Sequence, residues 1–200
     1  AGNIHEVGSI LARALEVLDK LRRELDDPMS ECRLYEPMRR HTTLKVGGPA
    51  QYWIEPITVE SFSKALRFFE QLNVPVRVVG RGSNLLVCDG GIAGAVIRPS
   101  GGEFSEVSIS GDFITAGVGA RFKKLNSAAK KNEIRGFEWM EGIPGNVGGG
   151  VRMNAGAMGV ETFDQVVSVK FLDSNGDLHE RSAKELKAKY RNVAELKNNY

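Results

Sequence analysis

Residues Gly142–Gly159 read GIPGNVGGGVRMNAGAMG, and the interpretation of the whole chain starts from this stretch. Seven of its eighteen residues are glycine, and Arg152 is its only charged residue. Glycine costs backbone entropy on folding, and this cost is offset where the chain needs a positive φ or where another group approaches closely. Main-chain N–H groups without side-chain cover can face the phosphates of a nucleotide. The alternative is a glycine-rich packing loop without a ligand.

The composition indicates an ordinary globular chain. Its 200 residues fit one domain or two small subdomains, and 42% of them are hydrophobic, enough to bury a core. A net charge of +2 is too small to indicate a nucleic-acid partner, and no signal peptide or long apolar run predicts a membrane segment. Cys32 and Cys88 lie far apart without a CxxC motif, which favours a reducing compartment and buried, unreactive thiols.

An amphipathic helix is predicted over residues 9–25, where five leucines recur at spacings of three and four. The leucines are Leu11, Leu15, Leu18, Leu21 and Leu25. Asp26-Asp27-Pro28 ends the helix, because proline disfavours the helical state in the residue before it. The stripe either packs on the body of the protein or pairs with a partner helix, and its short length favours packing.

Residues 51–79 read as a β-α-β unit. A strand at Gln51–Ile54 is followed by a helix that Thr58 can cap and that runs to about Leu72, and a second strand follows at Val76–Val79. The predicted buried face of the helix comprises Phe62, Ala65, Leu66, Phe69 and Leu72.

A second glycine-rich segment, Gly80–Val87, reads GRGSNLLV. It differs from the dinucleotide fingerprint because Leu85 stands in place of the third glycine and an apolar, strand-like run follows where that fingerprint requires a helix. No GxxxxGK[ST] motif occurs. The segment therefore predicts a strand, a glycine turn and another strand, with Ser83 and Asn84 at the tip; a tight turn without a ligand is the alternative.

The remaining chain is predicted to be richer in strands. Strands are expected at residues 95–97, 106–109, 113–118, 166–172 and 178–181, with a helix across 121–131. Asn175-Gly176 predicts a hairpin turn, and Ser182 with Glu185 predicts a capping box for a final helix that ends near Tyr190-Arg191. The fold class predicted from these elements is α+β.

Other chemistry is only weakly indicated. His5, His41 and His179 are scattered without metal-ligand spacing, and no GxSxG motif marks a nucleophile. Glu138 and Glu141 are candidate acid–base groups, although surface carboxylates are the simpler reading. Arg152 would either meet a phosphate or be a packed or solvated arginine.

Four motifs in one order resemble the UDP-N-acetylenolpyruvoylglucosamine reductase family, also called UDP-N-acetylmuramate dehydrogenase. They are His41–Ala50, the VxGxGSNLLV core of Val78–Val87, the GIPGxVGG and MNAGAxG motifs of Gly142–Gly159, and Tyr190-Arg191. The resemblance covers roughly residues 41–191.

The resemblance implies a vanillyl-alcohol-oxidase-like, PCMH-type fold of two α/β subdomains that hold FAD between them. The expected organisation is an amino-terminal helix over residues 1–34, a small α/β subdomain over 35–100 and a larger mixed subdomain over 101–200. FAD is expected to bind without a covalent link, because Ser83-Asn84 stands where related covalent flavoproteins carry histidine. The resemblance assigns to FAD the residues Val79, Gly80, Arg81, Gly82, Ser83, Asn84, Leu85, Gly142, Ile143, Pro144, Gly145, Val147, Gly148, Gly149, Ala155 and Gly156.

The implied reaction has two halves: NADPH reduces FAD, and the reduced flavin passes hydride to the enolpyruvyl double bond of a UDP-sugar, in the synthesis of peptidoglycan precursors in the bacterial cytoplasm. The resemblance gives Arg191 the catalytic role of stabilising the enolate-like intermediate, and places Tyr190 and Arg191 in substrate binding. A helix-end arginine bonded to backbone carbonyls is the alternative for Arg191.

Two departures from the family pattern stand out. Val193 replaces the serine of the YRxS motif, and the chain stops at Tyr200 without the GSxF segment that carries the proton-donating serine. The expectation is either a fragment that lacks the carboxy-terminal substrate domain or a member without the usual catalytic apparatus. The alternative functions are a non-catalytic FAD-binding or partner-binding module and a flavin-dependent oxidase of another alcohol or sugar.

Overall fold

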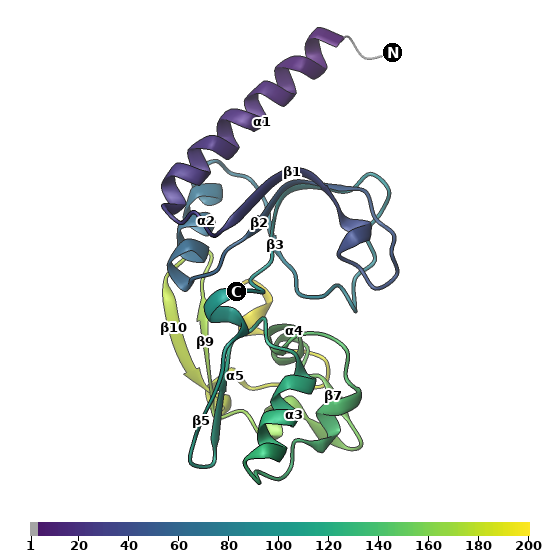
Figure 1. The fold of residues 1–200 in the computed structure, drawn as a ribbon, viewed down its shortest axis with the longest axis vertical. Helices are drawn as coiled ribbons and strands as arrows, with labels where there is room; N and C mark the ends of the chain where they lie inside the picture. The colour runs from purple at the N-terminus through teal and green to yellow at the C-terminus, as the bar shows by residue number, and fades with distance from the viewer. Residues whose placement is uncertain (1–3) are drawn as a thin grey trace.

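The structure is a computed structural model that describes residues 4–200. Figure 1 shows the chain as two halves, one from purple to blue and one from teal to yellow, with α1 (Ile4–Leu25) projecting from the first. The other elements of the first half are β1 (Glu31–Pro37), a 3-10 turn (Met38–Arg40), β2 (Pro49–Glu55), α2 (Val59–Gln71), β3 (Val76–Val78) and β4 (Ile92–Ile97).

A four-stranded sheet of order β1-β2-β4-β3 forms the first half. β1 is antiparallel to β2, whereas β2 and β3 both run parallel to β4, so that the predicted β-α-β unit is present with β4 inserted between its two strands. Thr58 caps α2, since its Oγ1 accepts a hydrogen bond from the Ser61 N–H at 3.0 Å. The carboxyl ends of β2, β3 and β4 therefore lie at one edge of the sheet, where open α/β sheets commonly bind ligands.

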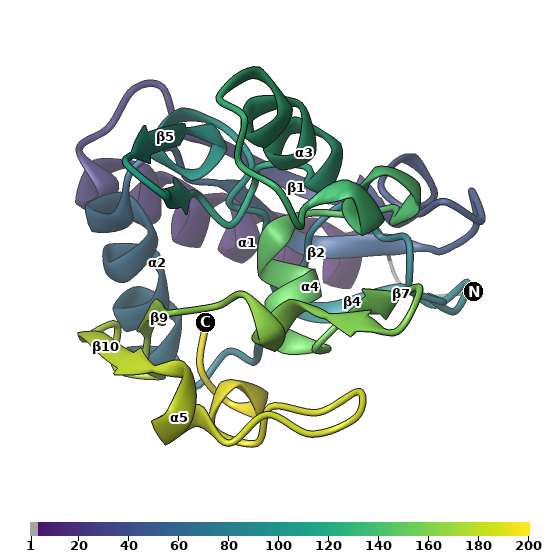
Figure 2. The same cartoon turned by 90° about the horizontal axis from the view of Figure 1, so that it is seen from below.

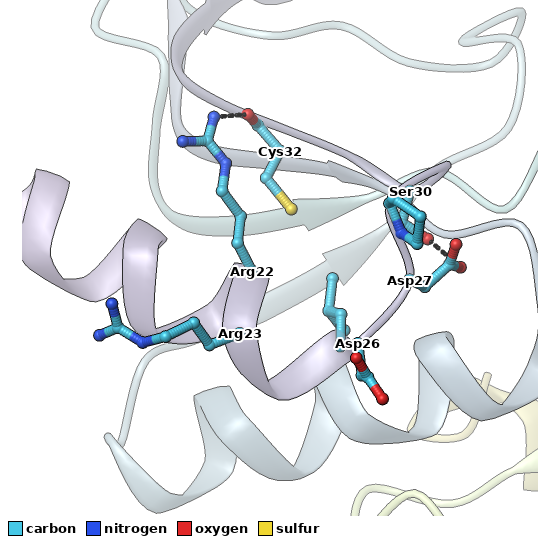
Figure 3. A pocket seen from close by; sticks show the side chains of 8 residues that line it. Arg22, Arg23, Asp26, Asp27, Ser30 and Cys32 are labelled. Atoms are coloured by element: carbon cyan, nitrogen blue, oxygen red, sulfur yellow. Dashed lines mark hydrogen bonds between the residues drawn. The ribbon is translucent and has the colours of Figure 1, made fainter.

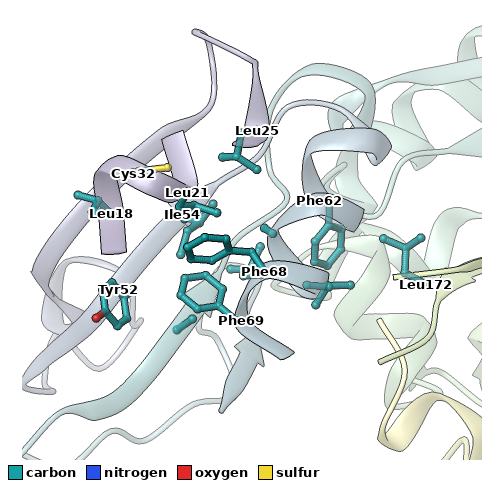
Figure 4. Close-up of a cluster of buried hydrophobic side chains, with 14 of the residues drawn as sticks. Leu18, Leu21, Leu25, Cys32, Tyr52, Ile54, Phe62, Phe68, Phe69 and Leu172 are labelled. Carbon is teal, nitrogen blue, oxygen red and sulfur yellow. The ribbon is translucent and has the colours of Figure 1, made fainter. Parts of the chain in front are cut away.

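One face of the sheet is covered by α1 and α2, whose apolar side chains form the largest buried cluster (Figure 4). Leu18, Leu21 and Leu25 are buried as predicted, but Leu11 and Leu15 are 44% and 46% exposed. The expected leucine stripe thus packs over its second half only. In α2 the predicted buried face is also present except for its last member, because Leu72 is 45% exposed beyond the end of the helix.

The other face of the sheet carries a smaller cluster around Trp53, Val96 and Val79. Leu85 and Val87 pack against this cluster while Leu86 is 76% exposed, which explains their strand-like alternation. The prediction of a strand after the glycine turn is nevertheless wrong, because these residues form no ladder with any strand of the described chain. Packing on the sheet face buries the apolar side chains instead.

The second half contains shorter elements around α3 and α4. They are a 3-10 turn (Gly102–Ser105), β5 (Val107–Ser110), β6 (Phe113–Ala116), α3 (Phe122–Lys131), a 3-10 turn (Glu138–Gly142), α4 (Val147–Arg152), β7 (Gly156–Ala157), β8 (Val160–Glu161), a 3-10 turn (Thr162–Asp164), β9 (Ser168–Leu172), β10 (Leu178–Ser182), α5 (Ala183–Leu186) and a final 3-10 turn (Glu195–Lys197). In Figure 2, α4 lies at the centre, between α3 and the β9–β10–α5 side. The predicted helix at 121–131, the β9–β10 hairpin and the Ser182–Glu185 capping box are all present. The helix that the capping box begins is shorter than predicted: α5 ends at Leu186 and not near Tyr190, because Lys187 adopts a left-handed backbone conformation.

The end of the chain returns to the first half. Tyr200 exchanges two main-chain hydrogen bonds with Leu172, at 2.5 and 2.7 Å, and its ring lies 6.4 Å from that of Phe62 in α2. Ser63 Oγ also donates to the Gly176 carbonyl at 2.5 Å, so the β9–β10 turn rests on α2. These contacts set the position of one half against the other.

The subdomain boundaries expected from the sequence can be placed on this fold. The position between residues 34 and 35 falls inside β1, and the position between 100 and 101 falls in the connection after β4. None of the helices described for residues 4–200 is long and apolar enough to cross a membrane.

Candidate functional site

The two glycine-rich segments meet between the two halves of the chain. Ser83 Oγ lies 3.5 Å from the Pro144 carbonyl oxygen, and a Cβ added to Gly145 would stand 3.1 Å from the same hydroxyl. A Cβ added to Gly80 would stand 2.9 Å from Asn146 Oδ1. The sequence predicted each segment separately, and the fold brings Gly80–Asn84 against residues 144–146.

The main chain of Gly80–Asn84 carries five consecutive N–H groups without an acceptor. Within the described residues 4–200, no carbonyl or side-chain oxygen accepts a hydrogen bond from any of them. The neighbouring Val79 N–H, by contrast, donates to the Ile97 carbonyl at 3.0 Å. Nearly all buried main-chain donors in folded proteins find a partner, and Gly82 in this run is buried. A run of free N–H groups at a strand end is typical of a loop that binds an anion.

Gly82 fixes the shape of this loop. Its φ is +65°, and a Cβ there would stand 2.1 Å from the His41 carbonyl oxygen and 2.8 Å from Thr42 Cα. Its own carbonyl accepts the Thr43 N–H at 3.1 Å. The main chain of His41–Thr43 therefore packs directly against Gly82. Only glycine permits so close an approach of the two main chains.

A basic cavity of about 250 Å³ adjoins the loop. Its lining comprises Arg40, His41, Thr42, Thr43, Arg81, Arg98 and Arg121. Arg98 follows β4 directly, Arg81 belongs to the loop, and Arg121 precedes α3, where it forms a bridge with Asn146. The cavity thus joins the first half, the loop and the second half, and it gathers four guanidinium groups beside the loop.

The glycines of Gly142–Gly159 divide into two groups. Gly148, Gly150 and Gly156 are packing positions, because an added Cβ would stand 2.9 Å from Val118, 2.0 Å from Phe122 and 2.5 Å from the Val160 carbonyl oxygen, respectively. At Gly142, Gly149 and Gly159 an added Cβ would meet nothing within 4 Å. The expectation of a bare backbone is therefore wrong for part of the stretch, which forms α4 and packs on Phe122; the three open glycines leave surface for a ligand.

The other residues predicted to hold FAD occupy supporting positions. Val79 is buried, Leu85, Ile143 and Val147 pack on apolar clusters, and Ala155 and Gly156 belong to the β7–β8 region. The Val147 and Gly148 N–H groups donate to the carbonyls of Ala120 and Val118 at 2.8 and 2.9 Å. These two N–H groups at the start of α4 are therefore engaged within the protein.

Tyr190 and Arg191 lie on an exposed turn. Lys189 and Asn192 close this turn with two main-chain hydrogen bonds, and Arg191 has a φ of +55°. Tyr190 is 81% exposed, and neither side chain has a hydrogen-bond or ion-pair partner within residues 4–200. Val193 follows the turn and anchors it to the protein, since it is 1% exposed and packs with Phe171, Leu186 and Leu196.

The remaining candidates are engaged elsewhere. Arg152 is exposed and donates a hydrogen bond to the Leu196 carbonyl, so its guanidinium is engaged within the protein. Glu141 is exposed and bonded to Lys123 and Asn126, while Glu138 accepts the Gly136 N–H. No cluster of metal-ligating side chains occurs in the part of the chain that the structure describes. The side chain of His5 lies outside the described residues.

A larger hollow of about 570 Å³ lies at the junction of α1 and β1 (Figure 3). Its polar groups are mostly satisfied: Arg22 donates to the Cys32 carbonyl at 2.8 Å, and Ser30 donates to Asp27 at 2.7 Å. None of its lining residues belongs to either glycine loop. Its two arginines are matched by two aspartates, Asp26 and Asp27, so the smaller cavity, which is lined by arginines beside the glycine loop, is the better candidate site for an anion.

Comparison with known proteins shows the family of this chain. The profile of the family described as the FAD binding domain matches residues 50–182, a range that contains both the Gly80–Asn84 loop and the Gly142–Gly159 stretch. The chain belongs to this family of FAD-binding domains. UDP-N-acetylenolpyruvoylglucosamine reductases are its curated relatives: that of Clostridioides difficile is 39% identical over 165 residues and that of Bradyrhizobium sp. 42% over 150 residues. These alignments cover 82% and 75% of this chain but 54% and 48% of the relatives.

Solved structures give the same result. The UDP-N-acetylenolpyruvylglucosamine reductase of Thermus caldophilus superposes with a TM-score of 0.68 at 36% identity, covering 82% of this chain and 56% of that protein. A variant of Phl p 4, a glucose dehydrogenase, has a TM-score of 0.60 at 18% identity over 88% of this chain and shares the fold alone. The chain has the PCMH-type FAD-binding fold and spans about half the length of the curated relatives that it matches.

Sequence reasoning missed the basic cavity. Arg40, Arg98 and Arg121 were not predicted as site residues, since each is a single arginine in an unremarkable stretch. The position of Arg98 in the sequence could have indicated its role, because it directly follows a strand that the sequence did predict. Side chains at the carboxyl ends of parallel strands lie at one edge of the sheet.

Proposed function

We propose that this chain is the FAD-binding part of an NADPH-dependent reductase that converts the enolpyruvyl ether of UDP-N-acetylglucosamine to UDP-N-acetylmuramate. The five unpartnered N–H groups of Gly80–Asn84 carry the proposal. A diphosphate has the oxygens that these donors lack, and the adjoining arginines offset its charge. Gly142 and Gly149 provide open surface on the facing loop for the rest of the dinucleotide.

The free N–H groups, the adjoining arginines and the open glycines fit FAD, and these residues would hold it without a covalent bond. Ser83 and Asn84 occupy the tip of the loop, and neither side chain forms the kind of carbon–nitrogen link that a histidine can make to a flavin. Bound FAD would supply hydride transfer between NADPH and the enolpyruvyl double bond. The chain's own part is to orient the dinucleotide through Gly80–Asn84 and to exclude water from its diphosphate.

Arg191 is proposed to act on the substrate carboxylate. Its exposed guanidinium has no carboxylate partner in the described chain, so it is free to meet an anion without breaking an existing contact. A cation placed where negative charge develops during reduction of the enolpyruvyl group stabilises that charge. Tyr190, exposed beside it, is proposed to contact the same substrate.

The cofactor part of the proposal is tested by flavin retention. We expect protein incubated with FAD and passed through a desalting column to carry one equivalent of flavin and to release it into the supernatant on acid precipitation. Failure to retain flavin at any added concentration would contradict the proposal. Flavin that stays in the pellet would contradict the non-covalent link.

The Arg191 part is tested by stopped-flow measurement of the two half-reactions in a protein that catalyses both. Arg191→Ala is expected to slow reduction of the enolpyruvyl substrate about a hundredfold or more, as for removal of one preorganised charge, and to leave flavin reduction by NADPH unchanged. Lysine should restore activity only in part, because it lacks the bidentate fork of arginine. Equal slowing of both steps would show that Arg191 acts on the protein or the cofactor instead.

A further inference from the structure

Arg98 is the innermost cation of the basic cavity and is incompletely satisfied. Its Nη1 lies 3.2 Å from His41 Nδ1 and 3.9 Å from Glu55 Oε2. Its Nε is buried and, among the described residues, has no hydrogen-bond partner. A guanidinium carries five donors, and burying them without acceptors is costly, so this arrangement favours an additional acceptor at the cavity.

His41 is held in one orientation by groups on three sides. Its ring stacks on Trp53 at 3.9 Å between centroids, and its Nε2 lies 2.9 Å from Glu36 Oε1. Because Arg98 can only donate, Nδ1 must accept, and Nε2 then carries the proton that it donates to Glu36. Arg98 thus donates a hydrogen bond to His41, and His41 donates one to Glu36. This fixed order of donors and acceptors sets the orientation of the guanidinium.

The acidic partners do not balance the charge of the cavity. Glu36 lies 3.6 Å from Arg40, and Glu55 is shared between Arg98 and two other donors, Trp53 Nε1 at 2.9 Å and Ser100 Oγ at 3.2 Å. Arg81 and Arg121 form no ion pair with any residue in the described range 4–200. Clustered guanidinium groups repel one another, and an anion between them removes that repulsion.

We propose that the basic cavity is a diphosphate site in which Arg98 contacts the ligand and His41, bonded to Glu36, is the positioning residue. The inference deepens the proposed function and rests on it for the source of the ligand. The diphosphate belongs either to FAD or to a nucleotide-sugar substrate, since both present the same charged oxygens. The guanidinium fork matches two oxygens of such a group, whereas the loop N–H groups supply directed donors beside it.

The site is tested with inorganic diphosphate on the flavin-free chain by isothermal titration calorimetry. We expect Arg98→Gln to weaken binding about tenfold or more, in line with the loss of a charge-assisted hydrogen bond, while Arg135→Gln, at an exposed arginine outside the cavity, leaves it unchanged. Undiminished binding by Arg98→Gln, or no binding by the parent chain, would overturn the proposal.

The source is identified by competition. Displacement of inorganic diphosphate by FAD assigns the site to the dinucleotide, and displacement by UDP but not by FAD assigns it to the substrate. A diphosphate that neither compound displaces would overturn the site as part of this protein's function. Retention of FAD by a chain in which Arg98→Gln alters the affinity for none of inorganic diphosphate, FAD and UDP refutes the inference and leaves the proposed function standing. Diphosphate binding without any FAD binding refutes the proposed function and leaves the diphosphate site standing.

The positioning role is tested by two histidine variants that lose the same ring. His41→Asn can keep an acceptor toward Arg98, whereas His41→Gln can keep a donor toward Glu36 and loses that acceptor. Both lose the stacking on Trp53, so their stabilities should fall together. We expect diphosphate affinity to be several-fold weaker in His41→Gln than in His41→Asn; equal affinities in two folded variants would show that His41 is only structural.

Discussion

Phe122 Cζ lies 2.0 Å from the point where a Cβ on Gly150 would stand. The neighbouring Gly149 has nothing within 4 Å of the same point, although both residues belong to α4. Two adjacent glycines therefore serve different purposes: one admits an aromatic ring from α3, and the other leaves the helix surface open.

Alanine at these two positions should separate packing from ligand binding. Gly150→Ala is expected to lower the free energy of unfolding by about 1–3 kcal/mol through overpacking against Phe122. Gly149→Ala should raise it by up to about 1 kcal/mol through helix propensity, yet weaken FAD binding if the open surface holds the cofactor. Urea unfolding and FAD titration measure the two effects, and a destabilised Gly149→Ala would contradict the assignment.

Val193 stands where the YRxS motif of the reductases that the chain resembles has serine, and its burial makes it a packing residue. Val193→Ser is expected to cost about 2 kcal/mol or more of unfolding free energy, because it removes apolar contacts with Phe171, Leu186 and Leu196 and buries a hydroxyl. Ala194→Ser, one residue further on and exposed, is the control and should stay within about 0.5 kcal/mol. A neutral Val193→Ser in chemical unfolding would refute this account.

The two thiols should react at very different rates. Cys88 is exposed in the connection after the loop, contrary to the expectation of a buried thiol, whereas Cys32 is buried beneath α1. Burial raises the pKa of the Cys32 thiol to about 11 and leaves little thiolate at neutral pH. A disulfide reagent should label one thiol rapidly in the native protein and both in denaturant, and Cys88→Ser should remove the fast phase. Retention of that phase in Cys88→Ser would contradict the assignment.

The Glu36–His41 pair should make stability sensitive to acid. Burial acts to raise the pKa of Glu36, but the His41 hydrogen bond and the charges of Arg33 and Arg40 outweigh it and lower the pKa. A lowered folded-state pKa stabilises the protein above the ordinary glutamate pKa of about 4.3, and the stabilisation is lost as the pH falls through the folded-state value.

The measurement is the free energy of unfolding of Glu36→Gln from pH 7 to pH 3. We expect a deficit of about 1.5–3 kcal/mol at pH 7, from loss of a charged hydrogen bond, that shrinks on acidification. Glu24→Gln, which removes the same charge from the exposed face of α1, controls for net charge. A deficit that is constant over this range would mean that the carboxylate charge of Glu36 contributes nothing.

Local signals predicted the elements whose shape is set within a few residues. Thr58 caps α2, and Asn175-Gly176 marks the turn between β9 and β10; both were recognisable because the same residues make the contacts. The prediction of a strand at Leu85–Val87 was wrong because alternating apolar and exposed residues show only that one side of a segment is buried. Packing on the face of a sheet buries one side of a segment just as pairing within a sheet does.

Features that depend on topology could not be predicted. β1 carries charged residues along Glu31–Pro37 and is recognisable only as the partner of β2. The basic cavity gathers Arg40, Arg81, Arg98 and Arg121, which are separated by up to about eighty positions, because β4 enters the sheet between β2 and β3. A glycine's purpose likewise depends on its neighbours in space, as Gly149 and Gly150 show.

The central claim is that the free N–H groups of Gly80–Asn84 bind the diphosphate of FAD, and residue-resolved amide hydrogen exchange tests it most directly. Amides of Gly80–Asn84 should exchange rapidly in the flavin-free chain and become protected at saturating FAD, because each gains an acceptor. Gly111 and Asp112, in the exposed turn between β5 and β6, should exchange equally fast in both states. Fast exchange of Gly80–Asn84 in a chain shown to be saturated with FAD would contradict the account.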